Sequence, residues 1–116
     1  MIKRENRLKK NRHFNYIYKH GASARYGCVA LVYLKTKSKP YKVGFSVSNK
    51  IGKSVVRNKI KRQMRESFNQ IAKLVDGRFN YIFVAKDGIV EKSFFEIKQN
   101  MINAVRKAGL LNEQDC

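Results

Sequence analysis

Residues 53–65 are the part of this chain whose residue types and spacing most clearly predict chemistry. They include six basic side chains, and the next acid along the chain is Glu66. Donors spread over two helical turns suit successive phosphates, and arginine binds phosphate through two parallel hydrogen bonds. A merely solvated helix face would intersperse acids, so the stretch predicts a contact with nucleic acid. On a helix one side would carry Asn58, Lys61, Arg62 and Arg65, flanked by Arg57 and Lys59.

A second basic segment, residues 9–20, interleaves aromatic side chains with cations. Phe14 and Tyr18 fall on one face of a predicted helix. Aromatic rings that stack on bases, beside cations that follow the backbone, are how proteins hold single-stranded nucleic acid. The alternative is that both rings are core residues under the helix, and the spacing alone leaves that open. The cations are Lys9, Lys10, Arg12 and Lys19.

The sequence lacks the usual patterns of an active site. Gly52-Lys53-Ser54 resembles the end of a phosphate-binding loop, but Val47 stands where that motif requires glycine. His13 and His20 would lie about 10 Å apart on one helix, which is long for flanking a single phosphate. Neither these histidines nor Cys28 has metal-ligand spacing. We therefore expect no catalytic residue and no metal site in the chain.

The excess of positive charge lies entirely in the first part of the chain. The net charge is +18, from 26 basic and eight acidic residues. Residues 1–65 hold 19 bases and one acid, whereas residues 66–116 hold seven of each. Such a distribution favours a polyanionic partner. Nucleic acid suits it better than an anionic membrane, because no strongly apolar amphipathic segment accompanies the charge.

The hydrophobic pattern predicts helices and strands in the order α-β-β-α-β-α. The predicted helices are residues 11–20, residues 54–74 and a last segment, with Asn11, Ser54 and Ser93 as their N-caps. The predicted strands are residues 26–34, 41–48 and 79–85, the first two joined by a polar loop and most simply antiparallel. This order predicts an α+β fold, a sandwich of helices packed on a small sheet. The long helix would bury Val56, Ile60, Met64, Phe68 and Ile71.

The chain is expected to form a single RNA-binding domain, residues 1–116, with a basic arm at 1–10 and a tail at about 111–116. Cys28 lies in an apolar run and Cys116 is the last residue, so we expect one buried and one free thiol. No apolar run approaches the roughly 20 residues that span a bilayer. No apolar segment follows the basic N-terminus, so we expect a cytoplasmic protein.

Three parts of the chain resemble the protein component of bacterial ribonuclease P, in the family's order and from about residue 7 to about residue 110. The run Val-Arg-Asn-Lys-Ile-Lys-Arg at 56–62, with Arg65 and Glu66 after it, resembles the family's Arg-Asn-Arg motif. The run Val-Gly-Phe-Ser-Val-Ser at 43–48, followed by Lys-Ile-Gly at 50–52, resembles its preceding strand and turn. Residues 7–10, Phe14 and residues 18–21 resemble its first helix.

The resemblance implies a fold, a function and partners. The long helix would join parallel strands by a left-handed crossover, against the usual rule. The protein would bind ribonuclease P RNA and precursor tRNA, and would assist the RNA-catalysed endonucleolytic removal of the tRNA 5′ leader. It would therefore be the non-catalytic subunit of a ribonucleoprotein endoribonuclease. Mg²⁺ would be held mainly by the RNA, and no dedicated protein partner is implied.

The resemblance also implies which residues bind RNA. Lys59 occupies the third position of the Arg-Asn-Arg motif, where it keeps the charge but loses the bidentate fork. The helix that meets the catalytic RNA would use Lys53, Arg57, Asn58, Lys59, Lys61, Arg62 and Arg65. The cleft for the single-stranded leader would use Phe14, Tyr18, Tyr33, Ser46 and Ser48. Further phosphate contacts would come from Lys9, Lys10, Arg12 and Lys50.

Three other functions share parts of this pattern. A ribosomal protein or ribosome-assembly factor would have a similar basic face, but its partner would be ribosomal RNA. A DNA-binding regulator would use residues 54–66 as a recognition helix, yet that helix is too long and follows strands instead of a first helix. A stand-alone nuclease would have to cleave RNA without any catalytic RNA.

Overall fold

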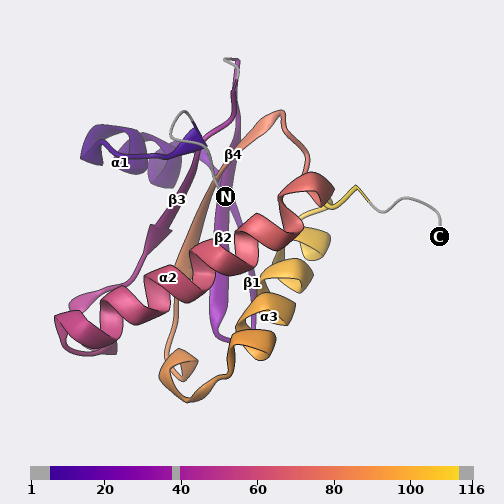
Figure 1. The fold of residues 1–116 in the computed structure, drawn as a ribbon. Coiled ribbons are helices and arrows are strands. Elements are labelled where there is room, and N and C mark those ends of the chain that lie inside the picture. Colours follow the sequence, from indigo (N-terminus) through magenta and orange to yellow (C-terminus); the bar gives the residue numbers. More distant parts are fainter. Residues whose placement is uncertain (1–5, 38–39, 113–116) are drawn as a thin grey trace.

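The computed structural model describes residues 6–37 and 40–112. Within these residues three α-helices cover the two faces of one four-stranded sheet (Figure 1). In chain order the main elements are α1 (Asn11–His20), β1 (Ala22–Tyr26), β2 (Val29–Lys35), β3 (Val43–Ser46), α2 (Ser54–Ile71), β4 (Phe79–Ala85) and α3 (Phe94–Lys107). Short 3-10 turns lie at η2 (Asn49–Ile51), η3 (Ala72–Leu74) and η4 (Ile89–Glu91).

The sheet has the strand order β1-β2-β4-β3, with β3 parallel to β4 and the other pairs antiparallel. The predicted α+β class is confirmed, and α2 joins the parallel pair. The predicted order holds with one addition, because the unpredicted strand β1 forms a hairpin with β2. The predicted pairing of residues 26–34 with residues 41–48 is wrong, since β4 lies between β2 and β3. The left-handed sense of the crossover stays a prediction.

Different helices cover the two faces of the sheet. Strand side chains alternate between faces, so Tyr81 and Phe83 of β4 join the main core with α2 and α3. Ile82, between them, packs on the opposite face with Leu8 and with Ile17 of α1. The sheet is therefore a middle layer, with α1 alone on one side and the pair α2 and α3 on the other (Figure 1).

The helix starts differ from prediction at two of three places. At α3 the prediction is confirmed: the Glu96 N–H donates to Ser93 Oγ, and the Ser93 N–H donates to Glu96 Oε1. At α1 and α2 the predicted caps, Asn11 and Ser54, are already the first helical residues. The caps are the extended lysines just before them, and neither makes a side-chain capping bond.

The chain ends that the structure describes are tied to the domain. The Leu8 N–H donates to the Val43 carbonyl at 2.9 Å, which fixes this part of the basic arm along the edge of β3. Leu111 forms a bridge to Val75 beyond the end of α2. Cys28 is buried as predicted, and burial raises the pKa of its thiol. The prediction for Cys116 lies outside the described residues.

Candidate nucleic-acid interface

The outer side of α2 carries the predicted cations. Ile60, Met64, Phe68 and Ile71 are buried against the sheet, which confirms the predicted apolar face, and Val56 is half-buried. We call the opposite side the basic stripe, defined as Asn58, Lys59, Lys61, Arg62 and Arg65. Together with Val55 these residues line a shallow groove of about 570 Å³, and none of the described residues that line it is acidic. An extended polyanion can therefore lie in this groove without meeting a like charge among its lining residues.

A second groove separates α1 from β3, and we call it the α1–β3 groove. Phe14 and Tyr18 of α1 form its aromatic side, with ring centroids 6.4 Å apart. Its volume is about 450 Å³. Tyr18 is 42% exposed, while Phe14 is half-buried, so one ring is open to a base and the other also serves packing. The lining residues are Asn11, Phe14, Asn15, Tyr18, Phe45, Ser46, Val47 and Lys61.

Glycine at position 44 lets the Phe14 ring pack close to β3. A Cβ placed on Gly44 would lie 2.5 Å from Cζ of Phe14, so any side chain there would displace the ring. Val43 and Val47 are buried in the main core, whereas Gly44 and Ser46 face α1.

The two grooves meet at Lys61. This half-buried residue lines the α1–β3 groove and also the groove along the basic stripe. A smaller pocket of about 320 Å³ lies beside both, where Lys61 and Arg65 approach Arg7 and Lys9 of the N-terminal segment. Four cations thus surround a floor formed by Phe14, Val43, Gly44 and Phe45. The shared lining residues make this surface continuous and positively charged.

Other predicted residues lie at the margins of this surface. Lys50 is exposed in η2, and Lys53 is exposed at the N-terminus of α2. Lys10 and Arg12 are exposed at the start of α1. Arg57 is half-buried, and its Nε donates to the Gly52 carbonyl at 3.1 Å, so it also holds the turn that precedes α2.

Two predicted cleft residues are not brought together with Phe14 and Tyr18. Tyr33 lies on the other face of the sheet, where it packs against the main core with its ring centroid 6.1 Å from that of Phe79. The alternation of β2 explains this, because Val32 and Leu34 are the residues that turn toward α1. Ser48 is exposed just beyond β3 and does not line the α1–β3 groove.

Several residues of the interface were not predicted as site residues. Asn11 and Asn15 line the α1–β3 groove, and their spacing from Phe14 and Tyr18 in the helix was a usable signal. Arg7 reaches the pocket beside Arg65 only because residues 7 and 8 pair with β3. Val55, 79% exposed, adds an apolar side chain to the groove of the basic stripe.

Residues 6–37 and 40–112 also show whether the protein has features of a metalloprotein or a membrane protein. No three His, Cys, Asp or Glu side chains gather there in a way that would hold a metal ion. None of the helices in this part combines the length and apolar character of a membrane span.

Comparison with known proteins gives the family. A family model for ribonuclease P matches residues 2–109. The chain belongs to the bacterial ribonuclease P protein family. The ribonuclease P protein component of Geobacillus sp. (strain WCH70) is 34% identical over 111 residues, which cover 95% of this chain and 96% of the relative. That of Clostridium beijerinckii is 36% identical over 116 residues, covering 94% and 93%.

Solved structures of the family agree with the fold. The ribonuclease P protein of Staphylococcus aureus superposes with a TM-score of 0.84 at 30% identity, covering 92% of this chain and 98% of the other. The Thermotoga maritima protein superposes with a TM-score of 0.79 at 25% identity, covering 87% and 96%. The resemblance inferred from the sequence motifs is thereby confirmed, and so is the arrangement of helices on a small mixed sheet.

Proposed function

We propose that this ribonuclease P protein binds the catalytic RNA through the basic stripe and holds the 5′ leader of precursor tRNA in the α1–β3 groove. The catalytic RNA carries the active site and most of the Mg²⁺, and the complex matures tRNA 5′ ends in the cytoplasm. The contribution of the protein is to raise affinity for the substrate and to screen phosphate repulsion near the cleavage site.

The observation that carries the proposal is the position of Lys61, which lines both grooves. A leader leaves the tRNA at the bond that is cut, so a protein that holds the leader must do so next to the catalytic RNA. Lys61 is placed to contact a phosphate where the two RNA strands converge. Separate surfaces for the two RNAs, on opposite sides of the molecule, would not serve this function.

The groove chemistry suits a leader of variable sequence. Tyr18 offers an exposed ring, and every base has a π-face that can stack on it. Ser46 and Asn15 offer hydrogen bonds to sugar or base edges, and Lys61 offers charge to the backbone. These contacts tolerate any sequence, so binding would depend on the presence of an unpaired strand and not on its bases.

Cleavage of a 5′-labelled precursor tRNA at low Mg²⁺ concentration tests the proposal. The assay uses a bacterial ribonuclease P RNA, with the protein added or omitted, and a reaction that contains the protein alone. We expect leader removal only when RNA and protein are combined. Cleavage by the protein alone would instead indicate a stand-alone nuclease. A protein that is inert in every reaction would redirect the search to ribosomal RNA.

A further inference from the structure

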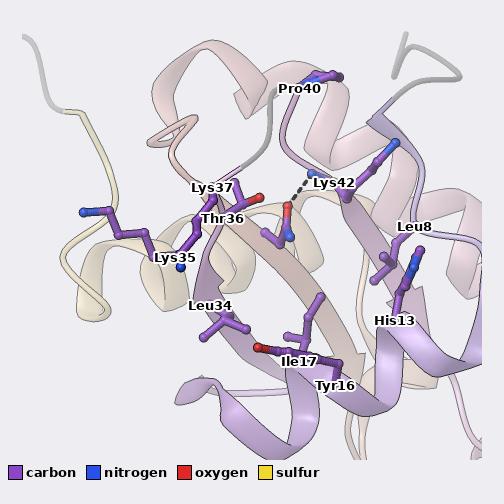
Figure 2. A pocket seen from close by; sticks show the side chains of 11 residues that line it. Leu8, His13, Tyr16, Ile17, Leu34, Lys35, Thr36, Lys37, Pro40 and Lys42 are labelled. Atoms are coloured by element: carbon purple, nitrogen blue, oxygen red, sulfur yellow. Dashed lines mark hydrogen bonds between the residues drawn. The ribbon is translucent and has the colours of Figure 1, made fainter.

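Another groove, which we call the α1–β2 groove, runs along the side of α1 opposite the α1–β3 groove. Figure 2 shows it in close view, with residues of α1 on one side and the end of β2 on the other. Its volume is about 400 Å³, which is within the range of ligand-binding clefts. The residues that matter here are Leu8, His13, Tyr16, Ile17, Leu34 and Lys37.

The geometry of α1 separates the α1–β2 groove from the α1–β3 groove. Ile17 is the buried contact of α1 with the sheet. At 100° per residue, Phe14 and Tyr18 turn to one side of it, while His13 and Tyr16 turn to the other. The lining residues follow this division, because Phe14 and Tyr18 line the α1–β3 groove and His13 and Tyr16 line the α1–β2 groove.

The α1–β2 groove has the chemistry that an unpaired nucleotide requires. Its floor is apolar, from Leu8, Ile17 and Leu34. Lys35 and Lys37, at and just beyond the end of β2, and Lys42, just before β3, also line it, and none of the described residues that line the groove is acidic. An apolar floor with an aromatic wall accepts a base, and the lysines suit the phosphate.

Tyr16 is the residue best placed to contact the base. Its side chain extends along the floor toward Leu34 (Figure 2). The ring remains 53% exposed, so its exposed surface is available to a partner. The His20 ring lies against it, with centroids 4.5 Å apart, which restricts the orientation of the tyrosine.

The outer side of α1, between the α1–β3 groove and the α1–β2 groove, carries positive charge. Arg12 and Lys19 are exposed, and they project from the helix roughly opposite the buried Ile17. A strand that leaves the α1–β3 groove can cross α1 over these cations, because a helix with its side chains is only about 10–12 Å wide.

We propose that the α1–β2 groove binds an unpaired nucleotide of the same leader, farther from the cleavage site, with its base against Tyr16. This inference rests on the proposed function, since it extends the path of the leader beyond the α1–β3 groove. The ligand is a nucleotide within single-stranded RNA, recognised by stacking and charge without regard to sequence.

Affinity as a function of leader length tests the inference. Precursor tRNAs with leaders lengthened one nucleotide at a time are bound to the reconstituted protein–RNA complex under conditions that prevent cleavage. With the unmodified protein, affinity should rise once as the α1–β3 groove fills and again when the leader reaches Tyr16. In Tyr16→Ala the second rise should be lost, a decrease of roughly fivefold or more for long leaders, while Tyr16→Phe should retain it.

Matched variants separate this inference from the proposed function. Phe95→Ala removes a comparably exposed ring from α3 and should change nothing. If Tyr16→Ala binds every leader as the unmodified protein does, or lowers the affinity for short and long leaders equally, the α1–β2 groove is not a leader site. A loss of affinity in Tyr18→Ala alone would then leave the proposed function intact. If Tyr18→Ala also has no effect, the assignment of the α1–β3 groove fails as well.

Discussion

The Phe14 ring lies so close to Gly44 that a Cβ on the glycine would come within 2.5 Å of Cζ and 2.7 Å of Cε1. This contact joins α1 to β3 beside the α1–β3 groove, which Phe14 lines. The glycine is needed here for space, because a side chain would occupy the position of the ring. The sequence of β3 therefore sets how near the aromatic residues of α1 approach the sheet.

Replacing Gly44 with alanine should impair leader binding. The added methyl group must push the Phe14 ring into the groove, and overpacking of this kind costs about 1–3 kcal/mol. Equilibrium binding of precursor and mature tRNA to the reconstituted complex, with urea unfolding in parallel, measures both effects. Gly77→Ala is the control, since a Cβ there meets only Tyr41 Cδ1 at an ordinary 3.8 Å. Equal affinities for Gly44→Ala and the unmodified protein would show that the ring position does not matter.

Tyr18→Ala should reduce affinity for precursor tRNA but not for mature tRNA. The exposed ring would stack on a leader base, and mature tRNA has no leader. Stacking on an aromatic residue is worth about 1–3 kcal/mol per base, so we expect at least a fivefold loss. Tyr26→Ala on β1 removes an equally exposed ring and serves as the control. An equal fall for both tRNAs would argue that Tyr18 supports the fold.

Replacing Arg62 and Arg65 together with alanine should weaken binding to the catalytic RNA. Both residues are exposed on the side of α2 away from the core, so the double alanine variant should remain folded by circular dichroism. Hydrogen bonds to charged groups contribute about 1.5–3 kcal/mol each, so affinity should fall tenfold or more. Cleavage should also require more Mg²⁺.

The matched control for charge is the double variant Lys73→Ala and Lys98→Ala. It removes the same two positive charges from η3 and α3, away from the basic stripe. If both double variants lose affinity for the catalytic RNA to the same extent, the loss is due to net charge and not to the position of the arginines. An unchanged cleavage rate and Mg²⁺ requirement for Arg62→Ala with Arg65→Ala would contradict the assigned role.

The Asp76 carboxylate should make the free energy of unfolding decrease in acid. Hydrogen bonds from the side chain of Arg78, with one from its backbone N–H, hold the pKa of this carboxyl below its ordinary value. Because the pKa is lower in the folded state, the stabilisation is complete above the unfolded pKa of about 3.9 and is lost as pH falls through the folded pKa. Asp76→Asn should therefore flatten the acid dependence of the unfolding free energy.

Urea unfolding at a series of pH values below about 5 measures this dependence. Asp87→Asn, an exposed carboxylate in the turn after β4, is the control and should leave the curve as it is. A curve for Asp76→Asn as steep as that of the unmodified protein would assign the acid sensitivity to other carboxylates.

Elements with strong local patterns were predictable from the sequence. β4 is dense in aromatic and β-branched residues and was predicted to the residue. α2 has an apolar residue every turn and was predicted from the correct start, but three residues too long, because residues 72–74 form a 3-10 turn. β1 was missed because Ala22, Ser23 and Ala24 carry little strand propensity, and the strand depends on its pairing with β2. The cations of the basic stripe were predictable because one helix contains them all.

The residues that line the α1–β3 groove were only partly predictable, for a reason visible in β2. This strand reads Val-Ala-Leu-Val-Tyr-Leu, with no polar alternation, because helices cover both faces of the sheet. Nothing local could therefore decide the face of Tyr33. The meeting of Phe14 with Gly44 is likewise a contact between distant residues, which hydrophobic periodicity does not report.

The bond from the Leu8 amide to the Val43 carbonyl covers part of a strand edge. β3 is an edge strand of the sheet, and an unpaired strand edge is a template on which another molecule can add its own strand. Residues 7 and 8 occupy part of that edge, and exposed Arg7 and Lys9 place positive charge beside it. A second copy of this basic chain would be repelled there, whereas RNA would be attracted. Residues 7–9 would therefore both attract RNA and disfavour strand pairing between copies of this chain.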